Sequence, residues 1–447
     1  MLLPEKCVPF PNFGRSGVYL FYLWGSIFLP MKYHYILLVA LLFCKINVAA
    51  AQEGCTDPQA LNFNALAVMN NGSCMYPTTT YIPVLKSTLP GSLNEISGLV
   101  YANGTWWAHN DSGNSNQFQE INPATGSVIR TVTLDNVTNR DWEDVAAVND
   151  TLFIGDFGNN GNNRTDLGVY TVPIEAIQGT SNPSVPASSY TFTNYSYPDQ
   201  SDFSAQPQDS TVFDCEAMLF ASNRLHLFSK NHRDYTTSHY TVNPLTGETT
   251  KKGTLDIGGM ITGADISPDG KVIALVGYNL RGLPAVFCWF LWDWPAGTDD
   301  YFQGNKRRIE FGSALISGQV ESIAFSGNRS GYIANENTTY NGIPLVAQGI
   351  RTFDCSQWIP EVSETSEPLF ARERLRVHPN PATEETAIFW EEGFTPLTLR
   401  LFTANGKLIQ KTDEPESGMS IRSESGIHFL VVQWNDGFFT TKCIVFE

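Results

Sequence analysis

Basic residues are scarce in this sequence. Its 447 residues include 28 Lys and Arg against 45 Asp and Glu, so the formal net charge is −17. Nucleic acid binding depends on a basic face, and this balance therefore argues against a nucleic acid partner. Charged residues make up only 16% of the chain, whereas Gly contributes 36 residues, Pro 25 and aromatics 12%. That composition favours a turn-rich β protein over a helical one.

The sequence also lacks several local enzyme motifs. It has no G-x-S-x-G elbow, no H-E-x-x-H zinc motif and no Gly-rich phosphate loop that opens a helix. His109, Asp111 and Ser112 are the residue types of a hydrolase triad. Their spacing is too short for one, because the base must approach the nucleophile from elsewhere in the fold. Any catalytic site must therefore be assembled from distant segments.

The N-terminal segment has the pattern of an export signal. From Met31 the chain reads MKYHYILLVALLFCKINVAAAQ, with Lys32, an apolar stretch too short to span a bilayer, and small residues before Gln52. We expect translation to start at Met31 and residues 1–51 to be absent from the mature protein. The alternative is that residues 17–29 form a genuine membrane segment. The first interpretation predicts an extracellular or outer-membrane surface location and no transmembrane helix in the mature protein.

Six cysteines follow the expected cleavage site, at positions 55, 74, 215, 288, 355 and 443. An exported protein can oxidise them, and Cys55 and Cys74 flank one compact polar segment, so we predict a disulfide between these two. Residues 54–76, GCTDPQALNFNALAVMNNGSCMY, resemble a short cysteine-bounded module common in secreted proteins of Bacteroidota. Asn70 and Asn71 stand where that module has paired Asp, which favours a disulfide-closed spacer over a cation site. We assign residues 52–77 to it.

Residues 78–355 contain one recurring pattern. Five segments each open with a polar or small pair, continue as an apolar alternation and are followed by second and third strands: ISGLVY, WEDVAAV, CEAMLF, GADISPDG and VESIAF. Repeats of this length with several strands each predict a five- or six-bladed β-propeller. A sixth unit would lie in 165–214, and residues 80–88 would close the ring by pairing with the last blade. A β-sandwich is the alternative.

The C-terminal part reads as a linker and a small β domain. Residues 356–371 are acidic and contain Pro, which is typical of a linker. Residues 372–447 resemble the type A sorting domain of the type IX secretion system, through Pro-Asn-Pro at 379–381, Asn405-Gly406-Lys407, and the strands at 426–429 and 442–446. This resemblance implies a β-sandwich, a Bacteroidota source and the type IX secretion machinery as a partner.

Acidic residues recur at the start of the repeats. Glu143, Glu216 and Glu321 occupy the same position, and Glu95 lies two residues earlier in its own unit, on the same strand face. The innermost strands of a propeller line a central channel, so these four side chains would converge. Clustered carboxylates raise one another's pKa or bind a cation, and Ca²⁺ is the ion we expect. The alternative is that separated Glu side chains only solvate the channel.

Further candidate ligands lie on the other strand face and in the loops. Asp144 and Asp265 follow the Glu position by one residue, and Asp156 ends the second strand of the second unit. The loop 109–114, which includes His109 and Asp111, occupies the corresponding place in the first unit, and residues 335–337, which include Glu336, occupy it in the last unit. Their oxygens would line a shallow site, although such residues more often cap turns. Arg164 and Lys230 would bind an anionic substrate there.

These segments together resemble a family of secreted bacterial propellers with phytase-like or esterase-like domains. The residues that carry the resemblance are 109–114, 141–146, 155–160 with Arg164, 214–218, 262–275 and 320–325. The resemblance implies a calcium-associated propeller that hydrolyses phosphoesters or esters. The competing hypothesis is a non-catalytic surface protein whose rim recognises a glycan or a protein. The partner is thus a small anionic substrate in the first case and a surface glycan or protein in the second.

Overall fold

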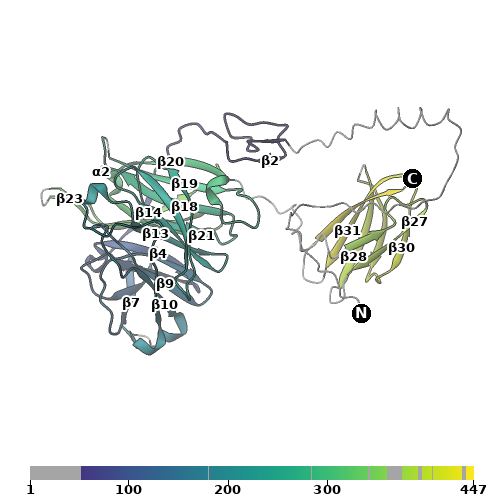
Figure 1. Ribbon diagram of the computed structural model, residues 1–447. Coiled ribbons are helices and arrows are strands. Elements are labelled where there is room, and N and C mark those ends of the chain that lie inside the picture. The colour runs from purple at the N-terminus through teal and green to yellow at the C-terminus, as the bar shows by residue number, and fades with distance from the viewer. Residues whose placement is uncertain are drawn as a thin grey trace, which may run out of the picture.

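The computed structural model describes residues 52–179, 181–282, 284–340, 343–359, 375–390, 395–404, 406–434 and 439–446. The expected signal segment and most of the expected linker lie outside these ranges. Strands dominate the described chain, as the ribbon in Figure 1 shows. None of its helices is long and apolar enough to cross a membrane.

Five blades, each with four antiparallel strands, form the main body. Blade 1 consists of β4 (Ile96–Ala102), β5 (Thr105–Asn110), β6 (Gln117–Asn122) and β7 (Ser127–Leu134). Blade 2 consists of β8 (Trp142–Val148), β9 (Thr151–Asp156), β10 (Gly168–Pro173) and β12 (Thr191–Asn194). Blade 3 consists of β13 (Asp214–Ala221), β14 (Arg224–Lys230), β15 (Thr236–Val242) and β16 (Thr249–Asp256). Blade 4 consists of β17 (Met260–Ile266), β18 (Val272–Asn279), β19 (Ala285–Trp292) and β20 (Asn305–Ser313). Blade 5 consists of β21 (Val320–Gly327), β22 (Ser330–Asn335), β25 (Gly349–Asp354) and β3 (Val84–Thr88).

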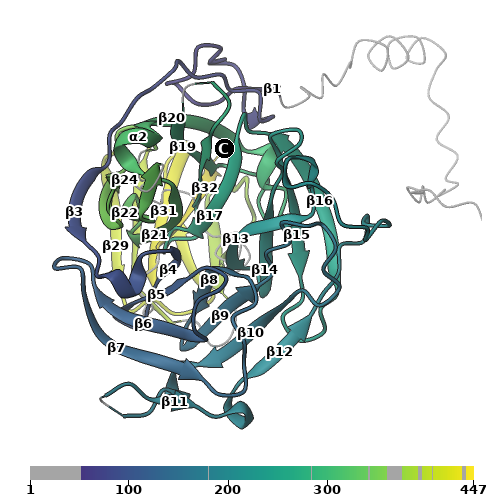
Figure 2. The same cartoon turned by 90° about the vertical axis from the view of Figure 1, so that its left-hand side faces the viewer.

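The five innermost strands close into a ring. Strands β4, β8, β13, β17 and β21 contact one another in this order, and β21 returns to β4 (Figure 2). Strand β3 comes from the start of the body yet pairs with β25, with Thr88 opposite Gly349. The predicted propeller is therefore confirmed, and so is its closure by residues 80–88.

The prediction of a sixth blade in 165–214 is wrong. This interval supplies β10 and β12, which complete blade 2, and the two-residue β11 (Ser184–Val185), which runs parallel to β7 at the edge of blade 1. Long connections between these strands account for its length. The described residues thus form five blades.

Apolar side chains between the blades hold the ring together. Val100, Trp107 and Leu152 belong to one buried cluster between blades 1 and 2, and Phe153 stacks on Phe220 between blades 2 and 3 with ring centroids 5.0 Å apart. The short elements lie in the connections: η1 (Gly91–Leu93), η2 (Ile174–Ala176), η3 (Ala187–Ser189), η4 (Gln208–Ser210), η5 (Tyr301–Gln303), α2 (Ala314–Ser317), β23 (Thr338–Tyr340) and β24 (Ile343–Val346).

The cysteine-bounded segment is attached to blade 4. It contains the parallel pair β1 (Glu53–Gly54) and β2 (Met69–Asn70), and Cys55 is bonded to Cys74 as predicted. Asn70 donates hydrogen bonds from Nδ2 to Asp293 Oδ2 (2.9 Å) and Asn305 Oδ1 (3.0 Å), and the Arg307 guanidinium lies 5.0 Å from the Tyr76 ring centroid. The disulfide-closed segment is therefore docked on blade 4.

The C-terminal strands form a β-sandwich. One sheet contains β26 (Leu375–His378), β27 (Glu385–Trp390) and β30 (Met419–Arg422), and the other contains β29 (Leu408–Asp413), β28 (Pro396–Thr403), β31 (Gly426–Trp434) and β32 (Phe439–Phe446). Buried side chains from both sheets, such as Ile388, Leu399 and Leu430, make one core. The small sandwich predicted here is confirmed, whereas its sorting role stays a prediction.

Candidate functional site

Each innermost strand of the propeller carries a β-bulge near its start. The extra residue is Ser97, Glu216, Thr262 or Glu321 in four of the strands, and the register shift in β8 falls at Glu143 and Asp144. A bulged residue has no partner in the ladder, so its side chain can be directed away from the sheet. The structure thus aligns Glu143, Glu216 and Glu321 as predicted. In blade 1 the equivalent residue is Ser97, and Glu95 lies just before the strand.

These strand starts surround a polar cavity of about 180 Å³ at one end of the channel. The four predicted channel glutamates, Glu95, Glu143, Glu216 and Glu321, all line it. All five blades contribute to the complete lining: Glu95, Ile96, Ser97, Asp111, Glu143, Asn160, Gln208, Glu216, Lys230, Tyr278, Gln319, Glu321 and Glu336. The structure therefore brings the channel carboxylates together.

The second strand of each blade supplies another part of the wall. Asp111 follows β5, Glu336 follows β22, and Lys230 and Tyr278 lie at or near the ends of β14 and β18. Glu336 lies in the loop 335–337, which was expected to line a shallow site with the other loops, although Glu336 was not named as a ligand. Its signal is a register match, because Asn335 pairs with Val320 as Asn110 pairs with Ile96, and each Asn directly precedes an acidic residue.

The cavity has a large excess of acidic over basic side chains. Six lining carboxylates, Glu95, Asp111, Glu143, Glu216, Glu321 and Glu336, face a single cation among the described lining residues, Lys230. Lys230 forms an ion pair with Glu216, and the two side chains are only 8% and 6% exposed. Burial raises the pKa of Glu216 well above its usual range, and Lys230 opposes this shift.

Two carboxyl groups on blade 5 are poised to exchange protons near neutral pH. Burial raises the pKa of Glu321 to about 7, with Lys230 lowering it. Burial, together with the charges of Glu321 and Asp111, raises the pKa of Glu336 to about 8. Gln319 contacts both, since its Nε2 donates to Glu336 and, at 3.4 Å, to Glu321 Oε1.

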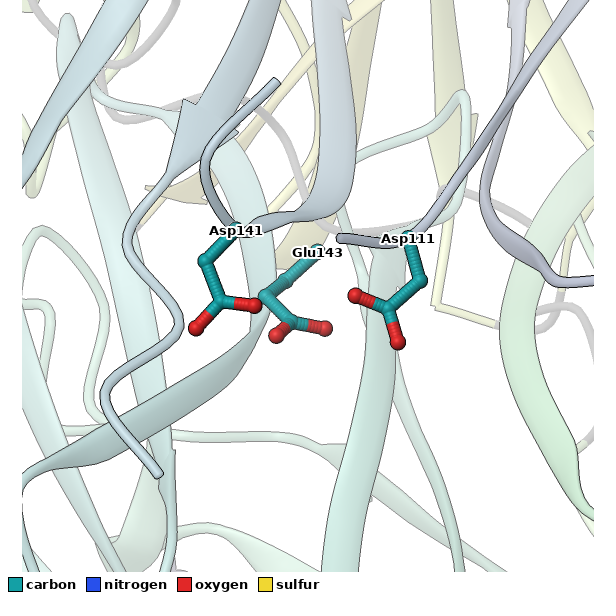
Figure 3. Close-up of side chains that lie close together, drawn as sticks. All are labelled: Asp111, Asp141 and Glu143. Carbon is teal, nitrogen blue, oxygen red and sulfur yellow. The ribbon is translucent and has the colours of Figure 1, made fainter. Parts of the chain in front are cut away.

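Three carboxylates converge on the side of blades 1 and 2. Ligand oxygens of Asp111, Asp141 and Glu143 lie within 4.8 Å of one another, and Figure 3 shows their carboxylates side by side. Burial, together with the charge of Asp111, raises the pKa of Asp141 to about 7. Oxygen donors gathered in this way suit a hard divalent cation. Asp141 was not among the predicted ligands, although it stands in the DWED stretch with Glu143.

Gly158 packs directly against this carboxylate trio. A Cβ atom at Gly158 would lie 2.2 Å from Glu143 Oε1 and 2.4 Å from Asp141 Oδ2. Such distances are far below van der Waals contact, so any larger residue would displace the carboxylates. The GDFGNN stretch therefore provides close backbone approach beside the trio.

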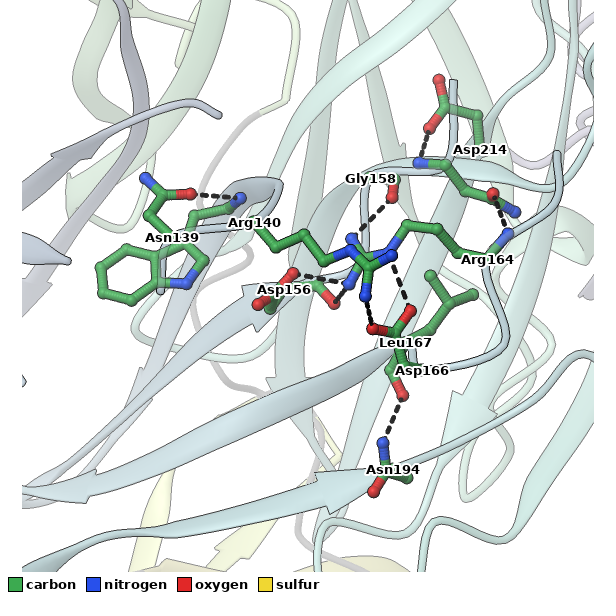
Figure 4. Close-up of polar contacts among 11 residues, drawn as sticks. Asn139, Arg140, Asp156, Gly158, Arg164, Asp166, Leu167, Asn194 and Asp214 are labelled. Atoms are coloured by element: carbon green, nitrogen blue, oxygen red, sulfur yellow. Dashed lines mark hydrogen bonds and ion pairs between the residues drawn. The ribbon is translucent and has the colours of Figure 1, made fainter. Parts of the chain in front are cut away.

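Arg164 does not face a ligand, contrary to the prediction. Its guanidinium donates to Asp156 Oδ1 (2.8 Å), Gly158 O (2.8 Å) and Asp166 Oδ1 (3.2 Å), and its side chain is 9% exposed (Figure 4). Asp156 was predicted as a metal ligand but is the buried ion-pair partner of Arg164. Both residues therefore fasten the loop that carries Gly158 and stand outside the cavity lining.

His109 also lies outside the cavity lining. It is 1% exposed, its Nδ1 is 3.0 Å from Asn110 O, and its ring meets Trp142 edge to face at 5.6 Å. Burial lowers the pKa of His109 to about 4, so the ring is neutral at physiological pH. The prediction of His109 as a site residue is corrected to a core histidine.

Asp144 and Asp265 connect neighbouring blades. Asp144 Oδ2 accepts hydrogen bonds from Met218 N (2.8 Å) and Ala264 N (3.3 Å), and Asp265 Oδ2 accepts from Phe325 N (2.7 Å). Their oxygens are committed to backbone donors in the interior, which explains why neither lines the cavity. The prediction of these two as metal ligands is therefore corrected to a structural role.

No protein-family model matches the sequence, and no curated protein matches it significantly. Similar solved structures include an aldose sugar dehydrogenase from Streptomyces coelicolor, with 9% identity, a TM-score of 0.37, and coverage of 62% of this chain and 99% of that one. An exo-β-1,3-galactanase from Phanerochaete chrysosporium has 11% identity, a TM-score of 0.36 and coverage of 82% and 99%. A putative 6-phosphogluconolactonase from Bacteroides uniformis has 12% identity, a TM-score of 0.28 and coverage of 84% and 90%. At these identities and TM-scores the comparisons carry no conclusion about the function of this chain.

Proposed function

We propose that this protein is an exported propeller hydrolase that cleaves phosphoesters or esters at the mouth of its central channel, with Ca²⁺ as cofactor. The observation that carries this proposal is the convergence of Asp111, Asp141 and Glu143 beside an acidic cavity. Three close carboxylates repel one another unless they take up protons or a cation. A hard divalent ion with oxygen ligands relieves that repulsion.

The ligand atoms fit such an ion in kind and in placement. All three residues offer carboxylate oxygen, and Gly158 leaves no side chain between them and the adjacent backbone. A bound divalent cation would supply Lewis acidity toward a carbonyl or phosphoryl oxygen. It would also attract an anionic substrate group into a cavity lined mainly by acidic side chains.

Other residues of the cavity would bind the substrate and transfer protons. Lys230 contributes a fixed positive charge on the side of blade 3, where its ion pair with Glu216 orients it. Glu321 and Glu336, with pKa values of about 7 and about 8, can donate or accept a proton at neutral pH. We propose that these two carboxyl groups move the proton to the leaving group or from the attacking water.

A non-catalytic binding protein is the second candidate. Among the described residues, the cavity lining contains no paired nucleophile and base. The Arg164 guanidinium donates its hydrogen bonds to residues of the fold, such as Asp156, and not to the cavity. A rim that only binds a surface glycan or a protein would need neither a nucleophile–base pair nor a free Arg164 guanidinium. The cavity of about 180 Å³ suits a small group better than a chain of sugars, which favours the hydrolase.

The proposed cellular location rests on a signal-like segment near the N-terminus and a sorting-domain-like segment near the C-terminus. The signal-like residues 31–52 and the likeness of 372–447 to a type IX sorting domain support export in a Bacteroidota bacterium. We propose that the type IX secretion machinery delivers the protein to the outer-membrane surface or the medium. Fractionation with and without residues 372–447 tests this step, and unchanged export of the truncated chain would contradict it.

The decisive experiment combines calorimetric titration with Ca²⁺ and a panel of phosphoesters and carboxylic esters. We expect cation binding, and turnover that a chelator abolishes. Glu143→Gln should lower cation affinity at least tenfold, and the exposed Glu248→Gln is the matched control. Cation binding without turnover on any substrate would favour the binding protein. No cation binding at all would refute both the cofactor and the role of the trio.

A further inference from the structure

A second cavity, here called the junction cavity, lies between the cysteine-bounded segment and blade 4. Its volume is about 550 Å³, and residues 56–58, 270–272 and 292–294 belong to its lining. Val272 of this lining begins β18, whereas Tyr278 of the acidic cavity lies near the end of the same strand. The stretch of extended chain between these two residues spans roughly 20 Å, so the two cavities lie at opposite ends of blade 4.

Two indole rings form the aromatic wall of the junction cavity. Trp292 ends β19, Trp294 follows it, and both line the cavity. The Trp292 ring packs against Tyr76 with ring centroids 5.6 Å apart. The Trp294 ring packs against Tyr301 at 4.8 Å. Trp289 donates its indole N–H to a backbone oxygen (3.1 Å), whereas the N–H groups of the two wall residues have no partner among the described residues. Indole rings fixed in this way offer a large contact surface at a small cost in conformational entropy.

Polar groups with free hydrogen-bonding capacity line the same cavity. Asn305 is 2% exposed, and its Oδ1 accepts from Asn70 Nδ2 (3.0 Å), whereas its own Nδ2 has no partner in the described part of the chain. Arg329 is 4% exposed and donates from Nε to a backbone oxygen (3.1 Å) and from Nη1 to Asp269 Oδ2 (2.9 Å), which leaves Nη2 without a partner among the residues described. Asp293 Oδ2 accepts from Asn70 (2.9 Å), and its Oδ1 has no described partner. Buried donors of this kind are costly when unpaired, so they indicate a polar ligand.

The combination of aromatic faces, donors and acceptors indicates the chemical class of the ligand. Hydroxyl groups both donate and accept, so a sugar can pair with the donors of Asn305 and Arg329 and with the acceptor of Asp293 at once. The flat indole surfaces match the face of a pyranose ring that carries only C–H groups. An aliphatic ligand would leave the three polar groups unpaired. An ion of either sign would meet a like charge, from Asp293 or from Arg329.

A neighbouring cavity extends this site toward blade 3. It also measures about 550 Å³, shares Trp294 and Gly270 with the junction cavity, and is lined further by Asp299, Tyr301 and residues 220–222. Each volume lies within the roughly 300–1,000 Å³ that is typical of ligand sites. Two adjoining cavities with one aromatic residue between them favour a chain of sugars over a single sugar.

We propose that the junction cavity and its neighbour bind a neutral oligosaccharide. Trp292 and Trp294 carry the sugar rings. Asn305 and Arg329 donate to hydroxyl groups, and Asp293 accepts from one. The site uses neither a cation nor the carboxylate trio, so it is independent of the proposed hydrolase. Because it lies at the other end of blade 4, a protein bound there to a glycan surface keeps its channel mouth free.

The test uses the full chain and neutral polysaccharides. Affinity electrophoresis in gels that contain a glucan, a mannan, a galactan or a xylan identifies the polymer that retards the protein, and calorimetry with oligosaccharides of that polymer gives the affinity. Trp294→Ala removes one ring of the aromatic wall. Arg329→Lys keeps the positive charge beside Asp269 but removes the Nη2 donor. Phe203→Ala is the matched control, because this aromatic residue is 40% exposed and belongs to neither lining.

We expect at least one polymer to retard the wild type, and Phe203→Ala to bind it with wild-type affinity. Trp294→Ala should lose at least tenfold in affinity, since aromatic anchors carry a large share of binding energy. Arg329→Lys should lose about tenfold, as the loss of one charged hydrogen-bond donor predicts. If Trp294→Ala has a lowered Tm, the affinity of Arg329→Lys decides.

The sugar site and the hydrolase can fail separately. No retardation by any of the polymers would overturn the sugar site, as would wild-type affinity in both variants. Binding that Glu143→Gln abolishes and Trp294→Ala spares would place the sugar in the acidic cavity and overturn it too. Affinity should be equal with Ca²⁺ and with a chelator. Sugar binding without ester turnover would refute the hydrolase alone, and ester turnover without sugar binding would refute the sugar site alone.

Discussion

Replacement of Lys230 by Met removes the one cation found among the described residues of the cavity lining. Glu216 then remains buried beside Glu321 without its ion-pair partner. The loss of one partner from a buried pair costs about 3–5 kcal/mol. A body of this size loses about 2 °C in Tm per kcal/mol, so we expect a decrease of about 6–10 °C at pH 8.

The pH dependence distinguishes this mechanism from a packing defect. Without Lys230 the folded-state pKa of Glu216 rises further above its usual value of 4.5, so the folded protein binds the extra proton. Stability then falls as pH rises above about 4.5, and the penalty almost vanishes at lower pH. The assay is thermal unfolding followed by tryptophan fluorescence from pH 4 to pH 8.

A second substitution makes the prediction refutable at a single pH. Adding Glu216→Gln to Lys230→Met removes the stranded charge, so the double variant should recover most of the lost stability at pH 8. A double variant as unstable as Lys230→Met would refute the reasoning. So would a Lys230→Met protein with wild-type Tm throughout the pH range.

Three further outcomes test the site. Gly158→Ala should weaken Ca²⁺ binding at least tenfold in calorimetry, since its Cβ would lie 2.2 Å from Glu143 Oε1, whereas Gly91→Ala, with open space around it, should have no effect. Arg164→Ala should lower Tm without a direct effect on a small substrate, because its donors serve the fold; a selective rise in KM at unchanged Tm would contradict this. Ca²⁺ affinity should increase from pH 6 to pH 9, as carboxyl groups with pKa values of about 7 and about 8 lose protons, and a flat profile would exclude their coupling to the ion.

The sequence predicts the propeller well because each blade repeats one local pattern. A polar pair followed by an apolar alternation marks every innermost strand, and that signal needs no knowledge of distant contacts. The blade number is harder to predict. Residues 165–214 have the length of a blade, yet their strands pair with β9 and β7, and no local signal distinguishes a new sheet from the completion of an old one.

The candidate site is predictable to the extent that it follows strand register. Glu143, Glu216 and Glu321 share one bulge position, and repeat alignment is sufficient to group them. Arg164 was misplaced because its partner Asp156 lies eight residues away, across a loop whose course depends on Gly158. Asp144 was misplaced because its acceptors meet backbone donors of other blades, a contact that has no sequence pattern.

The five bulges explain why the cavity is chemically asymmetric. In blades 1 and 4 the bulged residue is a hydroxyl that bonds the next innermost strand, since Ser97 donates to Glu143 O and Thr262 donates to Val320 O (2.7 Å). The other three blades place a carboxylate at that position, and Asp111 and Asp141 add two more beside blade 2. The densest group of carboxyl side chains therefore lies at blades 1 and 2, whereas Lys230 lies at blade 3, and Glu321 and Glu336 lie at blade 5. A cation bound at blades 1 and 2 would leave the part of the cavity at blades 3 and 5 free for a substrate. The proposed cation-dependent hydrolase requires this separation of the two sites.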